Sequence, residues 1–71
     1  MTIIIENKDS IRTIVLNRPE KLNSVNLEMA IELNQAVKNA ANDKSVQCLV
    51  ITGHGRAFSS GGDVDEMGDY L

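Results

Sequence analysis

The sequence has little of the chemistry that fixes a small protein covalently. Its 71 residues include one cysteine, one histidine, one proline and no tryptophan. A single cysteine cannot form a disulfide within the chain, and one cysteine with one histidine falls short of a zinc ligand set. We therefore expect no disulfide and no metal site.

Charge and hydropathy exclude two further classes of partner. The net charge is −3, so we expect no bulk attraction to nucleic acid or to an anionic membrane. No apolar run approaches the ~18 residues of a membrane span. The N-terminus lacks the basic region and apolar core of a signal peptide, and the lone cysteine fits a reducing compartment. The expected location is the cytoplasm.

Length limits how the chain can be stabilised. A domain this short buries only roughly 60% of its unfolded surface. Its 42% hydrophobic and 24% charged residues are ordinary for a globular protein and supply no unusual core. We interpret residues 1–71 as a single partial domain that needs other copies, another chain or a further part of the same protein.

Local patterns predict an α/β chain. Residues 2–6 and 11–16 are β-branched and apolar around a polar turn at 7–10, which predicts an antiparallel hairpin. Residues 46–52 are almost continuously apolar, which is typical of a strand covered on both faces.

An amphipathic helix is expected between these strands, at residues 27–41, with Asn26 as its N-cap. Its predicted buried face consists of Leu27, Ala30, Leu33 or Asn34, Val37 and Ala40. The expected order is strand, strand, helix, strand, glycine loop and helix start.

The glycine loop is the most informative segment. Arg56–Val64, RAFSSGGDV, follows the apolar strand and the turn Gly53–Gly55. It lacks the Gly-Lys of a phosphate-binding P-loop, the third glycine of the dinucleotide fingerprint and the flanking glycines of a nucleophile elbow. One interpretation is a main-chain N–H donor site at Gly62, followed by a helix capped by Asp63. The other is a turn that needs positive φ, with Asp63 as an ordinary cap. Both remain open from these residues alone.

A second segment, Leu16–Val25, reads LNRPEKLNSV. Arg18 and Lys21 could hold phosphates, or the segment could be a solvated loop whose asparagines close turns. We expect His54 to be an exposed turn residue and Cys48 a buried, inert thiol. The carboxylates Asp63, Asp65, Glu66 and Asp69 cluster as expected at a helix start.

Together the two segments resemble the crotonase superfamily of enoyl-CoA hydratases and isomerases, across essentially all 71 residues. The resemblance implies the N-terminal part of a spiral of strand-strand-helix units, usually assembled as trimers or paired trimers. It implies an acyl-CoA thioester partner, with coenzyme A as part of the substrate and no tightly bound cofactor. Gly62 would be the first N–H donor of an oxyanion hole that stabilises a thioester enolate. The implied contacts to coenzyme A are Glu20, Lys21, Leu22, Ser60, Gly62, Asp63, Val64 and Asp65.

The same resemblance places the second oxyanion donor and the acid/base carboxylates beyond residue 71. Two hypotheses follow. The parent protein is an acyl-CoA hydratase or isomerase, and residues 1–71 alone are expected to be inactive. Alternatively, the chain is a non-catalytic fragment that folds by self-association or with a partner chain.

Overall fold

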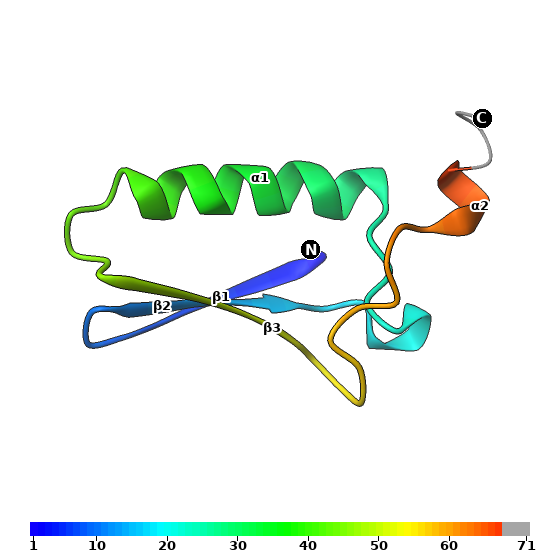
Figure 1. Cartoon of the computed structure of the whole chain (residues 1–71), viewed down its shortest axis with the longest axis horizontal. Coiled ribbons are helices and arrows are strands. Elements are labelled where there is room, and N and C mark those ends of the chain that lie inside the picture. Colours follow the sequence, from blue (N-terminus) through cyan, green and yellow to red (C-terminus); the bar gives the residue numbers. More distant parts are fainter. Residues whose placement is uncertain (68–71) are drawn as a thin grey trace.

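A three-stranded sheet with one helix across a single face forms the body of the molecule (Figure 1). The computed structural model describes residues 1–67. Its strands are β1 (Ile3–Lys8), β2 (Ile11–Leu16) and β3 (Cys48–Gly53), in the order β1-β2-β3. A 3₁₀ turn, η1 (Pro19–Lys21), and the long helix α1 (Leu27–Ala41) join β2 to β3, and α2 (Val64–Met67) follows the glycine loop. None of the helices in this part of the chain is long and apolar enough to cross a membrane.

The predicted hairpin is confirmed, with a longer first strand than expected. β1 and β2 pair antiparallel from Ile3 opposite Leu16 to Lys8 opposite Ile11. Residues 7 and 8 therefore belong to β1, although the sequence pattern assigned them to the turn. Only Asp9 and Ser10 remain between the strands, and Asp9 adopts a left-handed φ of 56°. Such short loops need positive φ to match the twist of the strands.

Helix α1 has the bounds expected from the sequence. The Asn26 side chain accepts a 2.8 Å hydrogen bond from the Met29 N–H, which satisfies one of the helix's free first-turn donors. The predicted buried face is wrong in part, because Leu27, Ala30 and Val37 are exposed. The face that packs on the sheet consists of Met29, Leu33, Ala36 and Ala40. The helix carries apolar side chains on several faces, so spacing alone could not select one.

The core lies between α1 and the inner face of the sheet. Ile14, Leu16 and Met29 are almost completely buried there, with Ile3 beside them. Complete burial of a side chain such as Met29 contributes about 1.5–3 kcal/mol. This small layer therefore holds the helix against the sheet.

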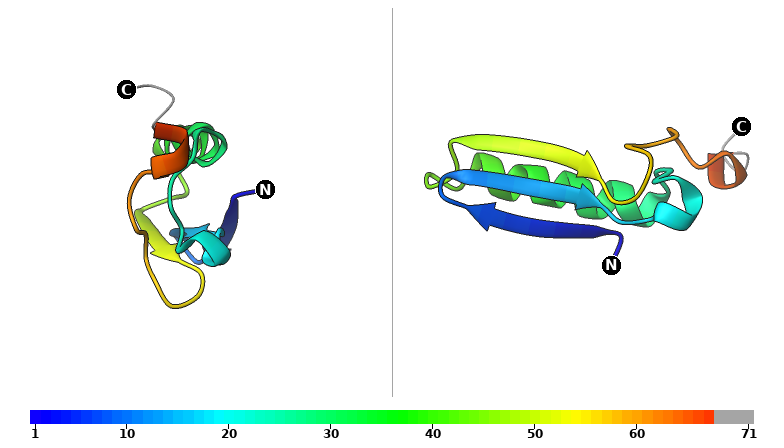
Figure 2. Two further views of the ribbon diagram at one scale, coloured as in Figure 1. Left: turned by 90° about the vertical axis from the view of Figure 1, so that its right-hand side faces the viewer. Right: turned by 90° about the horizontal axis from the view of Figure 1, so that it is seen from below.

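The opposite face of the sheet is open within residues 1–67, as Figure 2 shows in its right-hand view. Among the described residues β3 pairs only with β2, in parallel, and its Cys48 and Val50 are exposed. The expectation of a strand covered on both faces, and of a buried Cys48 thiol, is therefore wrong for the part of the chain that the structure describes. The strand is apolar on both faces as the pattern indicated, but within residues 1–67 an element packs only on the α1 side.

Candidate functional site

The two segments singled out by the sequence meet at one end of the sheet. β2 and β3 are parallel, so the segments that follow them leave from the same end of the sheet (Figure 1). Three main-chain hydrogen bonds then join them. The Ser60 N–H donates to the Leu22 carbonyl (3.0 Å), the Val25 N–H to the Gly61 carbonyl (2.8 Å), and the Asp63 N–H to the Val25 carbonyl (3.0 Å). Residues 22–25 and 60–63 thus form a short parallel ladder.

This ladder determines where the Gly62 N–H points. The Gly61 carbonyl faces Val25, and the intervening peptide bond is trans. In a trans peptide the carbonyl and the following N–H point in opposite directions. The Gly62 N–H is therefore turned away from Val25, and it has no acceptor within residues 1–67. The other interpretation, a turn that needs positive φ, fits Gly61, whose φ is 102°, but not Gly62.

Asn23 is the centre of this arrangement, and sequence reasoning missed it. Its side chain is fully buried, and its φ of 55° is left-handed. The carboxamide accepts from the Arg18 N–H (2.8 Å) and donates to the carbonyls of His54 and Ala57 (both 2.9 Å). The only sequence signal was an asparagine, the type that best tolerates a left-handed backbone. The two carbonyls that accept from it lie 31 and 34 residues away in the chain.

Arg18 ties the two segments together and is not displayed to solvent. Its guanidinium donates to the Ser24 carbonyl at 2.6 Å and pairs with the Asp63 carboxylate at 3.3 Å. The two charged side chains are only 13% and 17% exposed. Because the Arg18 guanidinium already bonds these partners within the fold, the structure does not support the expectation that it holds phosphates.

Asp63 has the capping role expected of it. Its second carboxylate oxygen accepts from the Asp65 N–H at 3.1 Å, as an N-cap of α2 does. Asp65 itself is exposed. Of the other carboxylates in the predicted cluster, Glu66 lies in α2, and Asp69 lies outside the described residues.

The remaining expected coenzyme A contacts lie around this ladder. Glu20, Lys21 and Leu22 occupy η1 and its C-cap and are all exposed. Leu22 has a left-handed φ of 51°, which turns the chain toward Ser60. Ser60 and Val64 are also exposed. The structure thus brings the two predicted groups to one surface, with Lys21 as its accessible cation.

The loop that leads into this surface is closely packed. A Cβ added to Gly53 would lie 2.7 Å from Phe58 Cα, so the close approach of residues 57–58 requires glycine there. His54 is an exposed turn residue, as expected, and its N–H donates to the Leu16 carbonyl at 2.8 Å. The loop therefore returns directly onto the end of β3.

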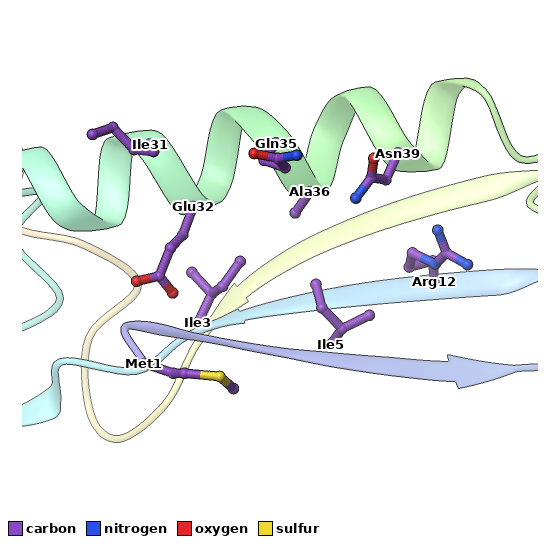
Figure 3. Close-up of a pocket in the computed structure, with 9 residues that line it drawn as sticks. All are labelled: Met1, Ile3, Ile5, Arg12, Ile31, Glu32, Gln35, Ala36 and Asn39. Atoms are coloured by element: carbon purple, nitrogen blue, oxygen red, sulfur yellow. The ribbon is translucent and has the colours of Figure 1, made fainter.

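A cavity of about 360 Å³ lies elsewhere, between α1 and β1 (Figure 3). Ile3, Ile5 and Ile31 line it, and none of the expected coenzyme A contacts does. Both charged side chains of this lining have partners: Glu32 accepts from the Thr2 N–H, and Arg12 pairs with Asp43. We therefore place the candidate site at the ladder and not in this cavity.

Comparison with known proteins assigns the family. The sequence profile of the enoyl-CoA hydratase/isomerase family matches residues 6–70. The chain belongs to this family. It is 43% identical over 56 residues to 1,2-epoxyphenylacetyl-CoA isomerase of Escherichia coli, which covers 79% of this chain and 21% of that protein. It is 42% identical over 62 residues to 3-hydroxyisobutyryl-CoA hydrolase 1 of Arabidopsis thaliana, which covers 87% of this chain and 16% of that protein.

Solved structures agree on the fold. The crystal structure of an enoyl-CoA hydratase from Mycobacterium marinum superimposes with a TM-score of 0.92 at 40% identity, covering 97% of this chain and 33% of that one. An enoyl-CoA hydratase from Thermoplasma volcanium superimposes with a TM-score of 0.90 at 38% identity, covering 100% and 28%. The chain is an α/β segment of the crotonase fold. It spans a third or less of the length of these proteins.

Proposed function

We propose that residues 1–71 supply one side of an acyl-CoA site in an enzyme of the hydratase/isomerase type. Gly62 N–H is one of two donors to the thioester carbonyl oxygen, which becomes negative as an enolate forms. A donor held in place before the reaction stabilises that charge without reorganisation. The observation that carries this proposal is the outward direction of the Gly62 N–H, which the Gly61–Val25 hydrogen bond fixes.

Coenzyme A enters this proposal as part of the substrate. Lys21 is exposed beside the ladder and suits a phosphate as a mobile point charge. The main chain of Ser60–Asp65 and the exposed side chains of Leu22 and Val64 offer polar and apolar contacts to the rest of coenzyme A. The relatives named above are an isomerase, a hydrolase and hydratases of CoA esters. All of these names refer to a CoA compound, which supports a CoA thioester as the substrate and leaves the reaction type open.

Replacement of Gly62 by proline tests the donor. Gly62→Pro deletes the N–H and leaves the Gly61 carbonyl and the Asp63 N–H able to bond Val25. In a longer form that contains these residues, kcat/KM for crotonyl-CoA should fall by about 10²–10³. Gly62→Ala is the matched control, because it retains the N–H at a position without positive φ. An unchanged kcat/KM in the proline variant would exclude the proposed role.

The open face of the sheet supports a second candidate, in which the chain folds by association with another copy or a partner. That face carries Ile4, Ile11, Cys48 and Val50, all exposed within residues 1–67. Apolar surfaces of this kind are typical of interfaces. We propose that this association is between copies of the chain, in the cytoplasm. A melting temperature that rises with protein concentration is expected, and a monomer whose melting temperature is independent of concentration would contradict it.

A further inference from the structure

Hydrogen bonds that begin at the main-chain carbonyl of the buried Asn23 hold Gly61, the residue that precedes the Gly62 N–H. The Asn23 carbonyl accepts from the Ser59 hydroxyl at 2.8 Å, and the same hydroxyl oxygen accepts from the Gly61 N–H at 3.1 Å. Gly61 in turn accepts from the Val25 N–H. Both sides of Gly61 are therefore held, one through Ser59 and one through Val25.

We infer that Asn23 is a positioning residue that holds the Gly62 N–H in the direction needed to bind a thioester oxygen. The inference rests on the proposed function of Gly62 and adds the residue that sustains it. Asn23 holds the start of its own segment through Arg18 N–H and the returning loop through the carbonyls of His54 and Ala57. Its main-chain carbonyl then holds Ser59. One buried residue thus holds both segments in register.

Few side chains can replace this carboxamide. The position needs a left-handed backbone, two donors and one acceptor at short reach, and asparagine supplies all of these. Aspartate has the same shape but, when ionised, presents acceptors to two carbonyl oxygens. Glycine accepts the backbone conformation and has no carboxamide. Asn23→Gly therefore removes the side-chain contacts without adding backbone strain.

Hydrogen exchange and amide NMR on the 71-residue chain test the inference. In Asn23→Gly we expect the Gly61 and Asp63 amides to exchange about tenfold faster or more, because local opening no longer breaks the three hydrogen bonds of the Asn23 side chain. Amides in α1 should change by about twofold at most. The change in the Gly62 amide proton shift on saturation with crotonyl-CoA should be smaller than in the unsubstituted chain, because the N–H no longer points at the thioester oxygen. The shift is compared at saturation so that weaker binding does not affect it.

Asp9→Gly is the matched control. Asp9 has a φ of 56°, almost identical to the 55° of Asn23, and its exposed side chain lies in the hairpin turn. The glycine substitution there alters the same backbone conformation and should leave the Gly61 and Asp63 amides unchanged. An equal effect of both variants would overturn the inference, because it would then reflect backbone freedom alone.

If Asn23→Gly unfolds the chain, Ser59→Ala tests the positioning role of Asn23 instead. It deletes only the hydroxyl between the Asn23 carbonyl and the Gly61 N–H. We expect faster exchange at Gly61 and a smaller Gly62 shift at saturation, with recovery in Ser59→Thr, which keeps a hydroxyl. If Gly61 exchange and the Gly62 shift match those of the unsubstituted chain, Asn23 does not act through this path. If the unsubstituted chain shows no Gly62 response to crotonyl-CoA, the proposed function fails, while exchange at Gly61 still reports the hold by Asn23.

Discussion

The Arg18 guanidinium and the Asp63 carboxylate lie 3.3 Å apart, although 45 residues separate them in the sequence. This ion pair joins the loop after β2 to the cap of α2 beside Gly62. The same guanidinium also donates a hydrogen bond to the Ser24 carbonyl. The pair therefore stabilises the arrangement of the two segments and not only a local turn.

Arg18→Met should destabilise the chain by about 1–3 kcal/mol, because a main-chain carbonyl and a largely buried carboxylate each lose a donor. Arg12→Met is the comparison, since Arg12 is almost as buried as Arg18, at 16% exposed, but pairs with a carboxylate, Asp43, that is 36% exposed. Water screens the Asp43 carboxylate more than the Asp63 carboxylate, so the control should cost less. Urea unfolding measures both changes. Equal losses would show that the Arg18 pair has no special role.

Acid should destabilise the far end of the molecule through Asp43. Hydrogen bonds from the Ser45 hydroxyl (2.6 Å) and N–H (2.9 Å), and then from Arg12, lower the pKa of Asp43 below its ordinary value of 3.8. The ionised form is thus favoured by folding. Its contribution is fully present above pH 3.8 and is lost as the pH falls through the lower, folded pKa.

Unfolding midpoints between about pH 5 and about pH 2 measure this effect. The decline should be shallower in Asp43→Asn, which has no carboxylate to protonate. Ser45→Ala should move the pKa of Asp43 back toward its ordinary value, as followed by the NMR shift of the carboxyl carbon. A decline equally steep in Asp43→Asn would assign the acid sensitivity to other groups.

Local signals in the sequence predicted the elements well. Helix α1 begins after Asn26 and ends at Ala41, as expected, because a cap and a helical period act over a few residues. The hairpin follows from two short β-branched runs. Asn23 and Arg18 could not be assigned in this way, since their decisive partners, Ala57 and Asp63, lie 34 and 45 residues away. No short-range pattern encodes such contacts.

The candidate site was predicted only in part for a related reason. The glycine pair and the Asn-Arg-Pro segment were found as motifs, and the structure places them side by side. The sequence does not tell which main-chain group of the glycine pair faces outward. That depends on the hydrogen bond between the Gly61 carbonyl and the Val25 N–H, which belongs to the other segment. The exposure of Cys48 depends on what packs on the sheet, which an apolar run does not reveal.

Gly53→Ala should disturb the loop that carries the site. The new Cβ would lie 2.5 Å from the Phe58 carbonyl oxygen and 2.7 Å from its Cα, and both are main-chain atoms that cannot rotate away. We expect a loss of about 1–3 kcal/mol in unfolding free energy, as for an overpacked position. Gly61→Ala is a useful comparison, because nothing lies within 4 Å of its Cβ and only the left-handed backbone is strained. Phe58 amide shifts should change in the first variant and not in the second.

The Cys48 thiol reports on the open face of the sheet. Leu49 packs against the core, so its neighbour Cys48 points to the opposite face, and it is exposed. The thiol should therefore react with a disulfide reagent in the native chain, without denaturant. If copies associate through this face, the rate should fall as protein concentration rises, because the interface covers the sulfur. The rate measured in urea is the control for intrinsic reactivity. A thiol that reacts only in urea, even in dilute solution, would contradict the open face.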